Sequence, residues 1–225
     1  MTSMRVLLTG FEPYGGRSLN PAFETMRALD GRAIGGAEVV GRALPVSLKQ
    51  LRQTLARHIE EVGPQAVIAL GLWPGEPMIR LERIGINVAD FEIADNEGAR
   101  PGDSMVAADG SPAKVTTLPL RAIEAAILAA GIPVRISSTA GTFLCNACLY
   151  TLLDLLEERG GRRNVPAGFI HVPYAPAQVA QMLEDLRAES VLELHQRADL
   201  ASMELMTTVR AIEIAIAVTV GSLAG

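Results

Sequence analysis

The sequence predicts an α/β fold in which helices cover both faces of a mainly parallel sheet. Apolar runs of strand length alternate along the chain with segments of helical periodicity, which is typical of this class. The run at 66–70 is apolar at every position, as expected for a strand buried on both faces. No internal repeat or linker interrupts the 225 residues, so we expect a single domain over 1–225.

Composition restricts the function classes. The chain is 49% hydrophobic, and its 20 Lys and Arg residues against 25 Asp and Glu residues include no basic run, which argues against a nucleic-acid partner. Two cysteines close in sequence are typical of a reducing compartment. The apolar segment 211–223 carries Glu213 and is shorter than the ~20 residues that cross a bilayer. We therefore expect a cytoplasmic protein without a membrane partner.

In the first third of the chain, strands are expected over 5–9, 38–44 and 66–70. Asn20 precedes a proline at the first position of a helix, the arrangement that N-caps favour. Ser47 caps a second helix, whose apolar face contains Leu48, Leu51, Leu55, Ile59 and Val62.

The remaining elements follow the same alternation. Further strands are expected over 80–88, 133–138 and 168–172, and the stretch from 95 to 112 is rich in turn residues. Helices are expected over 120–130, from Cys145 to the paired glycines at 160–161, over 176–186, over the polar segment 189–200, and from Leu205 to 220 with Ser202 as its cap.

Loops that follow parallel strands meet at the carboxyl edge of a sheet, where ligands bind. The loop at 10–16 carries two aromatic residues but has neither the Walker A nor the G-x-G-x-x-G spacing, so a phosphate cradle is not expected. This edge should gather the residues Phe11, Leu72, Cys145 and His171.

Cys145 is the candidate nucleophile at this edge. It follows a small-residue turn and lies near the first turn of a helix, where unpaired N–H groups stabilise an anion. We therefore expect its thiol to ionise below the free value of ~8.5. A buried core cysteine fits the same position, so both interpretations stay open.

A cysteine nucleophile needs a base and a group that orients the base. His58 and His195 lie on helical segments among charged residues, so a surface position explains both. His171 ends an apolar strand and fits either a base or a structural histidine. Glu82, on a strand-like stretch between apolar neighbours, would be partly buried and would need a partner such as an imidazole.

Four stretches in this order resemble pyroglutamyl peptidase I, a family of cysteine peptidases. They are 8–16 with Asn20-Pro21, 81–87, 140–146 and 168–174, and the turn at 95–98 matches as well. The resemblance implies an α/β/α open sandwich with a twisted sheet. It also implies a cytoplasmic homo-oligomer, usually a tetramer, that uses no metal and no cofactor.

The resemblance further implies removal of an N-terminal pyroglutamyl (5-oxoproline) residue from peptides through a thioacyl-enzyme. The nucleophile falls on Cys145, the base on His171 and the orienting carboxylate on Glu82. The implied substrate-binding residues are Phe11, Tyr14, Asn20, Leu72 and Phe143. Of these, Phe11 and Phe143 enclose the ring, and backbone groups near Leu72 bind the lactam.

Two departures keep alternatives open. Tyr14 stands where the family usually has Phe, and Glu92 stands where it commonly has Arg, which leaves a relative that only binds oxoproline-like ligands possible. Cys145 and Cys148 form a C-x-x-C pattern, so a thiol–disulfide oxidoreductase is the other alternative. Cys148 is expected in the core.

Overall fold

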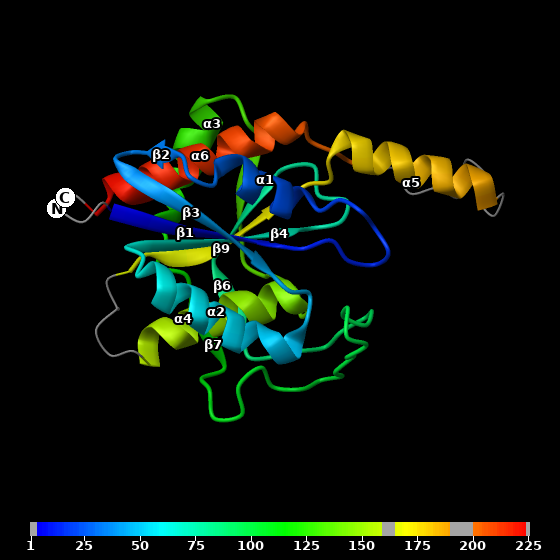
Figure 1. Cartoon of the computed structure of the whole chain (residues 1–225), viewed down its shortest axis with the longest axis horizontal. Coiled ribbons are helices and arrows are strands. Elements are labelled where there is room, and N and C mark those ends of the chain that lie inside the picture. Colours follow the sequence, from blue (N-terminus) through cyan, green and yellow to red (C-terminus); the bar gives the residue numbers. More distant parts are fainter. Residues whose placement is uncertain (1–3, 159–164, 190–199, 224–225) are drawn as a thin grey trace.

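The computed structural model describes residues 4–158, 165–189 and 200–223 (Figure 1). The strands are β1 Met4–Phe11, β2 Ala33–Ile34, β3 Ala37–Leu44, β4 Ala66–Leu72, β5 Ile79–Glu82, β6 Ile84–Ile86, β7 Ala113–Val115, β8 Val134–Ser137 and β9 Ala167–Val172. The helices are α1 Pro21–Leu29, α2 Leu48–Val62, α3 Leu120–Ala129, α4 Leu144–Glu158, α5 Pro176–Glu189 and α6 Leu205–Gly221.

The main sheet has seven strands in the order β2-β3-β1-β4-β9-β5-β8, with β1 and β4 near its centre. Strands β3, β1, β4 and β9 run parallel to their neighbours in that set. Strand β5 is parallel to β8 but antiparallel to β9, and β2 is antiparallel to β3. The sheet is therefore mainly parallel, and strands β6 and β7 form a separate antiparallel pair.

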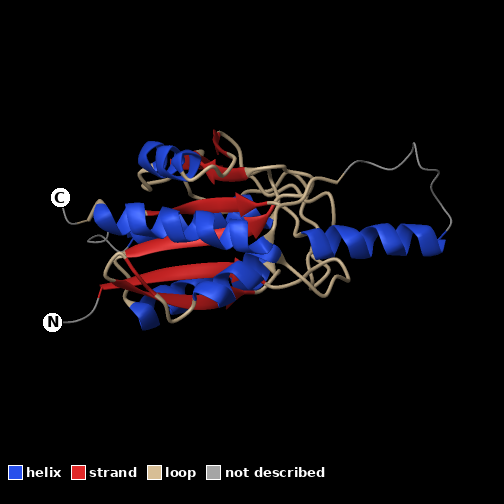
Figure 2. Cartoon of the chain, turned by 90° about the horizontal axis from the view of Figure 1, so that it is seen from above, coloured by secondary structure: helices blue, strands red, loops and turns tan. Residues whose placement is uncertain are grey.

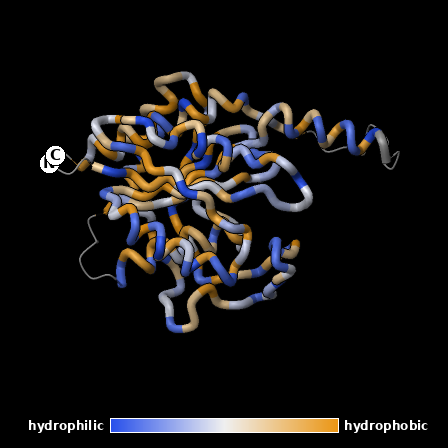
Figure 3. The backbone as a smooth tube through the Cα atoms, viewed as in Figure 1, coloured by the Kyte–Doolittle hydropathy of each residue, from blue (hydrophilic) through white to orange (hydrophobic). Residues whose placement is uncertain are grey.

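Helices cover both faces of the main sheet (Figure 2). On one face α1, α3 and α6 pack around a core that includes Leu8, Ile68 and Ile212. On the other face α2 and α4 pack on Leu7 and Phe169. Apolar colour concentrates along the central strands in Figure 3, and every residue of β4 is buried. This three-layer arrangement confirms the predicted α/β class.

The capping residues expected from the sequence mark the starts of two of the three helices for which a cap was expected, α1 and α2 but not α6. The Asn20 side chain accepts a hydrogen bond from the Ala22 N–H at 3.1 Å, and Ser47 caps α2 by accepting from the Gln50 N–H at 3.2 Å. Ser202, however, does not cap α6. The helix begins after Glu204, which makes no side-chain cap, and Ser202 instead forms a bridge with Tyr174.

The expected strand over 80–88 is two strands in different sheets. After Glu82 the chain leaves the main sheet at Arg83, whose N–H donates to the Ser137 carbonyl and whose carbonyl accepts from the Thr116 N–H. Residues Ile84–Ile86 then pair with Ala113–Val115, to which the sequence assigned no element. The single-strand expectation was wrong because the exit depends on these hydrogen bonds to Ser137 and Thr116, which are distant in sequence.

Helix α5 extends away from the rest of the molecule (Figures 1 and 2). It runs three residues beyond the expected end at 186. The polar helix expected over 189–200 lies almost entirely outside the described residues, as do the paired glycines at 160–161. Within the described ranges, no helix combines the length and the apolar character that crossing a membrane requires.

Candidate active site

Glu82 and His171 come together because their strands are neighbours. Glu82 ends β5, His171 is the second-last residue of β9, and the two strands pair with Arg80 opposite His171. The Nδ1 atom of His171 lies 2.8 Å from Oε1 of Glu82. Both side chains are sealed from solvent, with 1% and 0% exposed. The buried carboxylate therefore has the imidazole partner that the sequence led us to expect.

Cys145 approaches the Glu82–His171 pair from the helical layer that contains α4. It is the second residue of α4, after a turn in which Gly141 has φ +75°. Its Sγ atom lies over Gly71 so closely that a Cβ on Gly71 would come within 2.8 Å of it. Gly71 is paired with His171 in the register of β4 and β9. The thiol and the imidazole therefore lie over adjacent strands at the same level of the sheet.

Burial determines the protonation states in the free site. It raises the pKa of the Cys145 thiol to about 12, and the negative charge of Glu82 acts in the same direction. Burial also lowers the pKa of His171, although the hydrogen bond to Glu82 opposes this. The expected thiol pKa below the free value was wrong, because burial and the Glu82 charge both disfavour the thiolate. The resting pair is a neutral thiol and a neutral imidazole.

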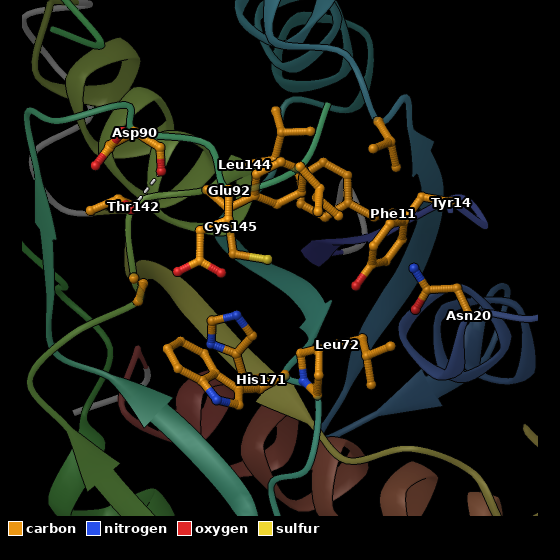
Figure 4. A pocket seen from close by; sticks show the side chains of 17 residues that line it. Phe11, Tyr14, Asn20, Leu72, Asp90, Glu92, Thr142, Leu144, Cys145 and His171 are labelled. Carbon is orange, nitrogen blue, oxygen red and sulfur yellow. Dashed lines mark hydrogen bonds between the residues drawn. The ribbon is translucent and has the colours of Figure 1, made fainter. Parts of the chain in front are cut away.

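A cavity of about 360 Å³ opens above these residues. Figure 4 shows Phe11, Tyr14, Asn20 and Leu72 on one side of the Cys145 sulfur and Asp90, Glu92 and Thr142 on the other. The first side is apolar and aromatic, whereas the second carries two carboxylates. The sulfur therefore lies at the boundary between two chemically different halves of the pocket.

All five expected substrate-binding residues line this cavity: Phe11, Tyr14, Asn20, Leu72 and Phe143. The rings of Tyr14 and Phe143 lie 6.4 Å apart, and Phe143 also contacts Phe91 at 4.5 Å. The Tyr14 hydroxyl points into the cavity (Figure 4), and burial raises its pKa.

Asn20 has a structural task besides its place in the lining. Its Oδ1 accepts from the Ala22 N–H, and its Nδ2 donates to the Glu12 carbonyl at 3.1 Å. Both polar ends of the side chain are therefore already bonded to the chain. Asn20 would therefore contact a ligand by packing against it as part of the cavity wall.

Cys148 and His58 lie away from this chemistry. Cys148 is fully buried in the core around α2 and α4, as expected. His58 is buried against β3, with Nε2 3.1 Å from the Ala43 carbonyl oxygen, so the expected surface position was wrong. His195 lies outside the described residues. Among the described residues, no group of three or more His, Cys, Asp or Glu side chains could hold a metal ion.

Sequence reasoning gave no role to three residues that support the site. Trp73 lines the cavity, and its ring meets the His171 ring edge-on at 4.9 Å. Asn146 ties α4 to β6 through hydrogen bonds with the Ile86 N–H and carbonyl, both at 2.9 Å. Arg80 hydrogen-bonds Glu82 at 3.0 Å. A charged residue between two apolar ones in a strand was the available signal for Arg80.

Comparisons with known proteins agree with this geometry. A sequence model of the family described as pyroglutamyl peptidase matches residues 4–222. A pyrrolidone-carboxylate peptidase from Cupriavidus pinatubonensis is 42% identical over 217 residues, which cover 96% of this chain and 93% of the relative. One from Thermococcus litoralis is 41% identical, with 96% and 92% covered.

Solved structures are similar as well. The pyrrolidone carboxyl peptidase from Thermococcus litoralis superposes with a TM-score of 0.87 at 40% identity, covering 98% of this chain and 95% of its own. A mutant pyrrolidone carboxyl peptidase from Pyrococcus furiosus gives a TM-score of 0.88 at 35% identity, with 98% and 100% covered. Sequence, fold and the converging residues agree, and the chain belongs to the pyroglutamyl peptidase family.

Proposed function

We propose that this protein is a cysteine exopeptidase that removes an N-terminal pyroglutamyl residue from peptides. The observation that carries the proposal is the convergence of Cys145, His171 and Glu82 beside a cavity that has an aromatic half. Family membership supports the substrate class. We assign Cys145 as the nucleophile, His171 as the general base and acid, and Glu82 as the residue that orients the imidazole.

The first step transfers the thiol proton of Cys145 to Nε2 of His171 while sulfur attacks the carbonyl carbon that follows the ring. A tetrahedral intermediate forms, its carbon–nitrogen bond breaks, and His171 returns the proton to the leaving amine. The product still bound is a thioester between Cys145 and the pyroglutamyl group. Water then attacks this thioester with His171 again as base, which releases pyroglutamate and restores the thiol.

The neutral resting pair supports this order of proton transfers. Because the pKa of the thiol is raised and that of the imidazole is lowered, the proton stays on sulfur until the substrate is attacked.

The negative charge that develops on the carbonyl oxygen of the substrate needs hydrogen-bond donors to stabilise it. We propose that these donors are backbone N–H groups in the first turn of α4, because the first N–H groups of a helix lack an intrahelical partner. Such donors contribute roughly 3 kcal/mol to transition-state stabilisation.

The aromatic half of the cavity suits a neutral lactam ring. Ordinary aminopeptidases bind a charged terminal amine, whereas 5-oxoproline offers only an apolar ring with one N–H and one carbonyl. We propose that Phe11 and Phe143 enclose the ring and that backbone groups near Leu72 bind the lactam. The Tyr14 hydroxyl, which points into the cavity, adds a polar contact that phenylalanine could not make.

The alternative functions find less support. A thiol–disulfide oxidoreductase would use Cys148 as its second thiol, yet Cys148 is fully buried beneath the helix. A relative that only binds oxoproline-like ligands would not need the buried Glu82–His171 pair. Glu92 lines the cavity, but on the side away from the aromatic residues, so it leaves the proposed ring site intact.

The substrate class is tested by release of a fluorescent amine from a pyroglutamyl amide, with the prolyl amide as the matched control. The prolyl ring has the same size but carries a charged amine and lacks the ring carbonyl. We expect turnover of the pyroglutamyl amide alone under reducing conditions. A folded protein that hydrolyses neither amide at any pH from ~5 to 9 would contradict the proposal.

Three expectations stay predictions. We propose that residues 1–225 form one catalytic domain, that the enzyme assembles as a homotetramer and that it acts in the cytoplasm. The two cysteines are free thiols in the structure, which fits a reducing compartment. Light scattering of the purified chain measures the oligomeric state directly.

A further inference from the structure

Arg80 is a buried cation that the reaction, as proposed above, assigns to no step. It lies two residues before Glu82 in β5, so both side chains point to the same face of the strand. Its Nε donates to Oε1 of Glu82 at 3.0 Å, and the same oxygen lies 2.8 Å from Nδ1 of His171. The arginine and the histidine therefore share one carboxylate oxygen.

The other end of the guanidinium group holds the turn that leads to Cys145. Its Nη2 donates to the Ser137 hydroxyl and to the Thr139 carbonyl, each at 2.7 Å. Its face stacks on the Trp73 ring at 3.7 Å, and Trp73 in turn meets the His171 ring. One side chain thus contacts the carboxylate, the turn before the nucleophile and the aromatic neighbour of the base.

The buried charge of Glu82 is a second reason to assign Arg80 a role in the site. Glu82 is fully buried, and its Oε2 has no hydrogen-bond partner among the described residues, so the charge needs a nearby cation. Arg80 also pairs with buried Glu76 at 3.2 Å, and half-exposed Arg135 pairs with Glu76 at 2.6 Å. The result is a row of alternating charges from Glu82 to the surface, in which each acid has a cation.

We propose that Arg80 is a positioning residue: it holds the Glu82 carboxylate in the orientation that fixes His171, and it holds the turn that presents Cys145. This role rests on the proposed function of the three residues. A Lys could supply the charge but not the planar fork that reaches Glu82, Glu76 and the turn together. Arg80 touches no substrate in this arrangement and acts only through its neighbours.

The proposal has a consequence for the ionisation of His171. Glu82 and Glu76 favour the protonated imidazole, whereas Arg80 and burial oppose it. The Cys145 thiol faces the ring from α4 and is neutral. The carboxylates of Asp90 and Glu92 lie across the sulfur from Phe11 and Tyr14, and Figure 4 shows that of Glu92 beside the sulfur. Removing Arg80 therefore shifts the pKa of His171 upward, since the nearest opposing cation is lost.

The intrinsic fluorescence of Trp73 can report this shift in the pKa of His171. Trp73 is the single tryptophan, and its ring contacts His171, so a protonated imidazole quenches its fluorescence. We would titrate this fluorescence with pH in the wild type and in His171→Gln, in which the transition should vanish. The double variant Arg80→Gln with Glu76→Gln removes one charge of each sign from the cluster. It should raise the midpoint by less than about one pH unit, because the loss of Glu76 offsets part of the effect of losing Arg80.

The acid limb of the kcat/KM profile should move with the fluorescence midpoint, which a purely structural role would not produce. Arg80→Lys should give a smaller shift and a kcat lowered about tenfold. Arg121→Gln, which removes an exposed arginine paired with Glu124, is the matched control and should change neither quantity.

A folded double variant with the wild-type midpoint and acid limb would overturn the proposal. If the double variant does not fold, Arg80→Lys provides the test. An unchanged fluorescence midpoint together with an unchanged kcat in Arg80→Lys would equally overturn the proposal. The fluorescence titration needs no substrate. A failure of the positioning role can therefore be told apart from a failure of the proposed peptidase activity.

Discussion

The Glu82 carboxylate and the His171 imidazole form a hydrogen bond of 2.8 Å from which solvent is excluded. An ionised carboxylate only accepts hydrogen bonds, so the neutral ring must carry its proton on Nδ1. Its Nε2 then presents a lone pair on the side where Cys145 lies. The acid therefore fixes both the tautomer and the direction of the base.

Glu82→Gln should lower kcat by at least about 100-fold with little change in KM, because the amide can hold either tautomer of the ring. Steady-state kinetics on a pyroglutamyl amide measures this, and circular dichroism checks the fold. Near-normal kcat in a folded Glu82→Gln variant would mean that the carboxylate does not orient the base.

The activity should depend on pH through His171 on the acid side. Because burial lowers the pKa of His171, kcat/KM should reach half of its plateau below pH 6.5 and fall further as the ring gains its proton. The raised pKa of Cys145, about 12, should keep the plateau level up to pH 9. Alkylation by iodoacetamide should be slow at pH 5, whereas a preformed thiolate–imidazolium pair would react rapidly there.

Gly71→Ala should damage both stability and activity. The added Cβ would lie 2.6 Å from Phe169 Cζ and 2.8 Å from the Cys145 sulfur, where little room exists for either to move. We expect a loss of about 1–3 kcal/mol in the free energy of unfolding. Gly102→Ala is the control, since its Cβ would meet nothing within 4 Å. Equal denaturation midpoints for the two variants would refute this reading of the contact.

Glu92 should influence which residue follows the pyroglutamyl ring. Asp90 and Glu92 line the half of the cavity opposite Phe11 and Tyr14, and among the described residues no Lys or Arg lines the cavity. Peptides with Lys after the ring should be cleaved about two- to fivefold better at low salt than peptides with Glu there. Glu92→Gln should reduce this ratio, and Asp109→Asn, outside the cavity, should not. A ratio independent of Glu92 would exclude this role.

Much of the fold could be predicted because strong local signals agree with the tertiary structure. The apolar run of β4 and the capped starts of α1 and α2 each depend on a few neighbouring residues. The exit at Arg83 could not be predicted, since it depends on hydrogen bonds to Ser137 and Thr116, which are distant in sequence. The antiparallel direction of β5 likewise depends on partners rather than on its own residues.

The sequence predicted which residues of the candidate site lie together, but it did not predict the pKa of Cys145 or the charge partner Arg80. Chain order at the sheet edge brought Cys145 and His171 together, and the resemblance singled out Glu82 among many acids. The raised pKa of Cys145 escaped prediction because it depends on tertiary burial of the thiol and on the nearby Glu82 charge. Arg80 escaped for a similar reason, since its contacts join its own strand to the loop before it and to the distant end of β8.

The central claim is that Cys145 is the nucleophile of a pyroglutamyl peptidase. The most direct measurement compares hydrolysis of a pyroglutamyl amide by the wild type, Cys145→Ala and Cys148→Ala under reducing conditions. The account predicts that Cys145→Ala abolishes turnover while Cys148→Ala, which alters only a buried core position, keeps it. Turnover that survives in folded Cys145→Ala, or that requires both thiols, would contradict the account.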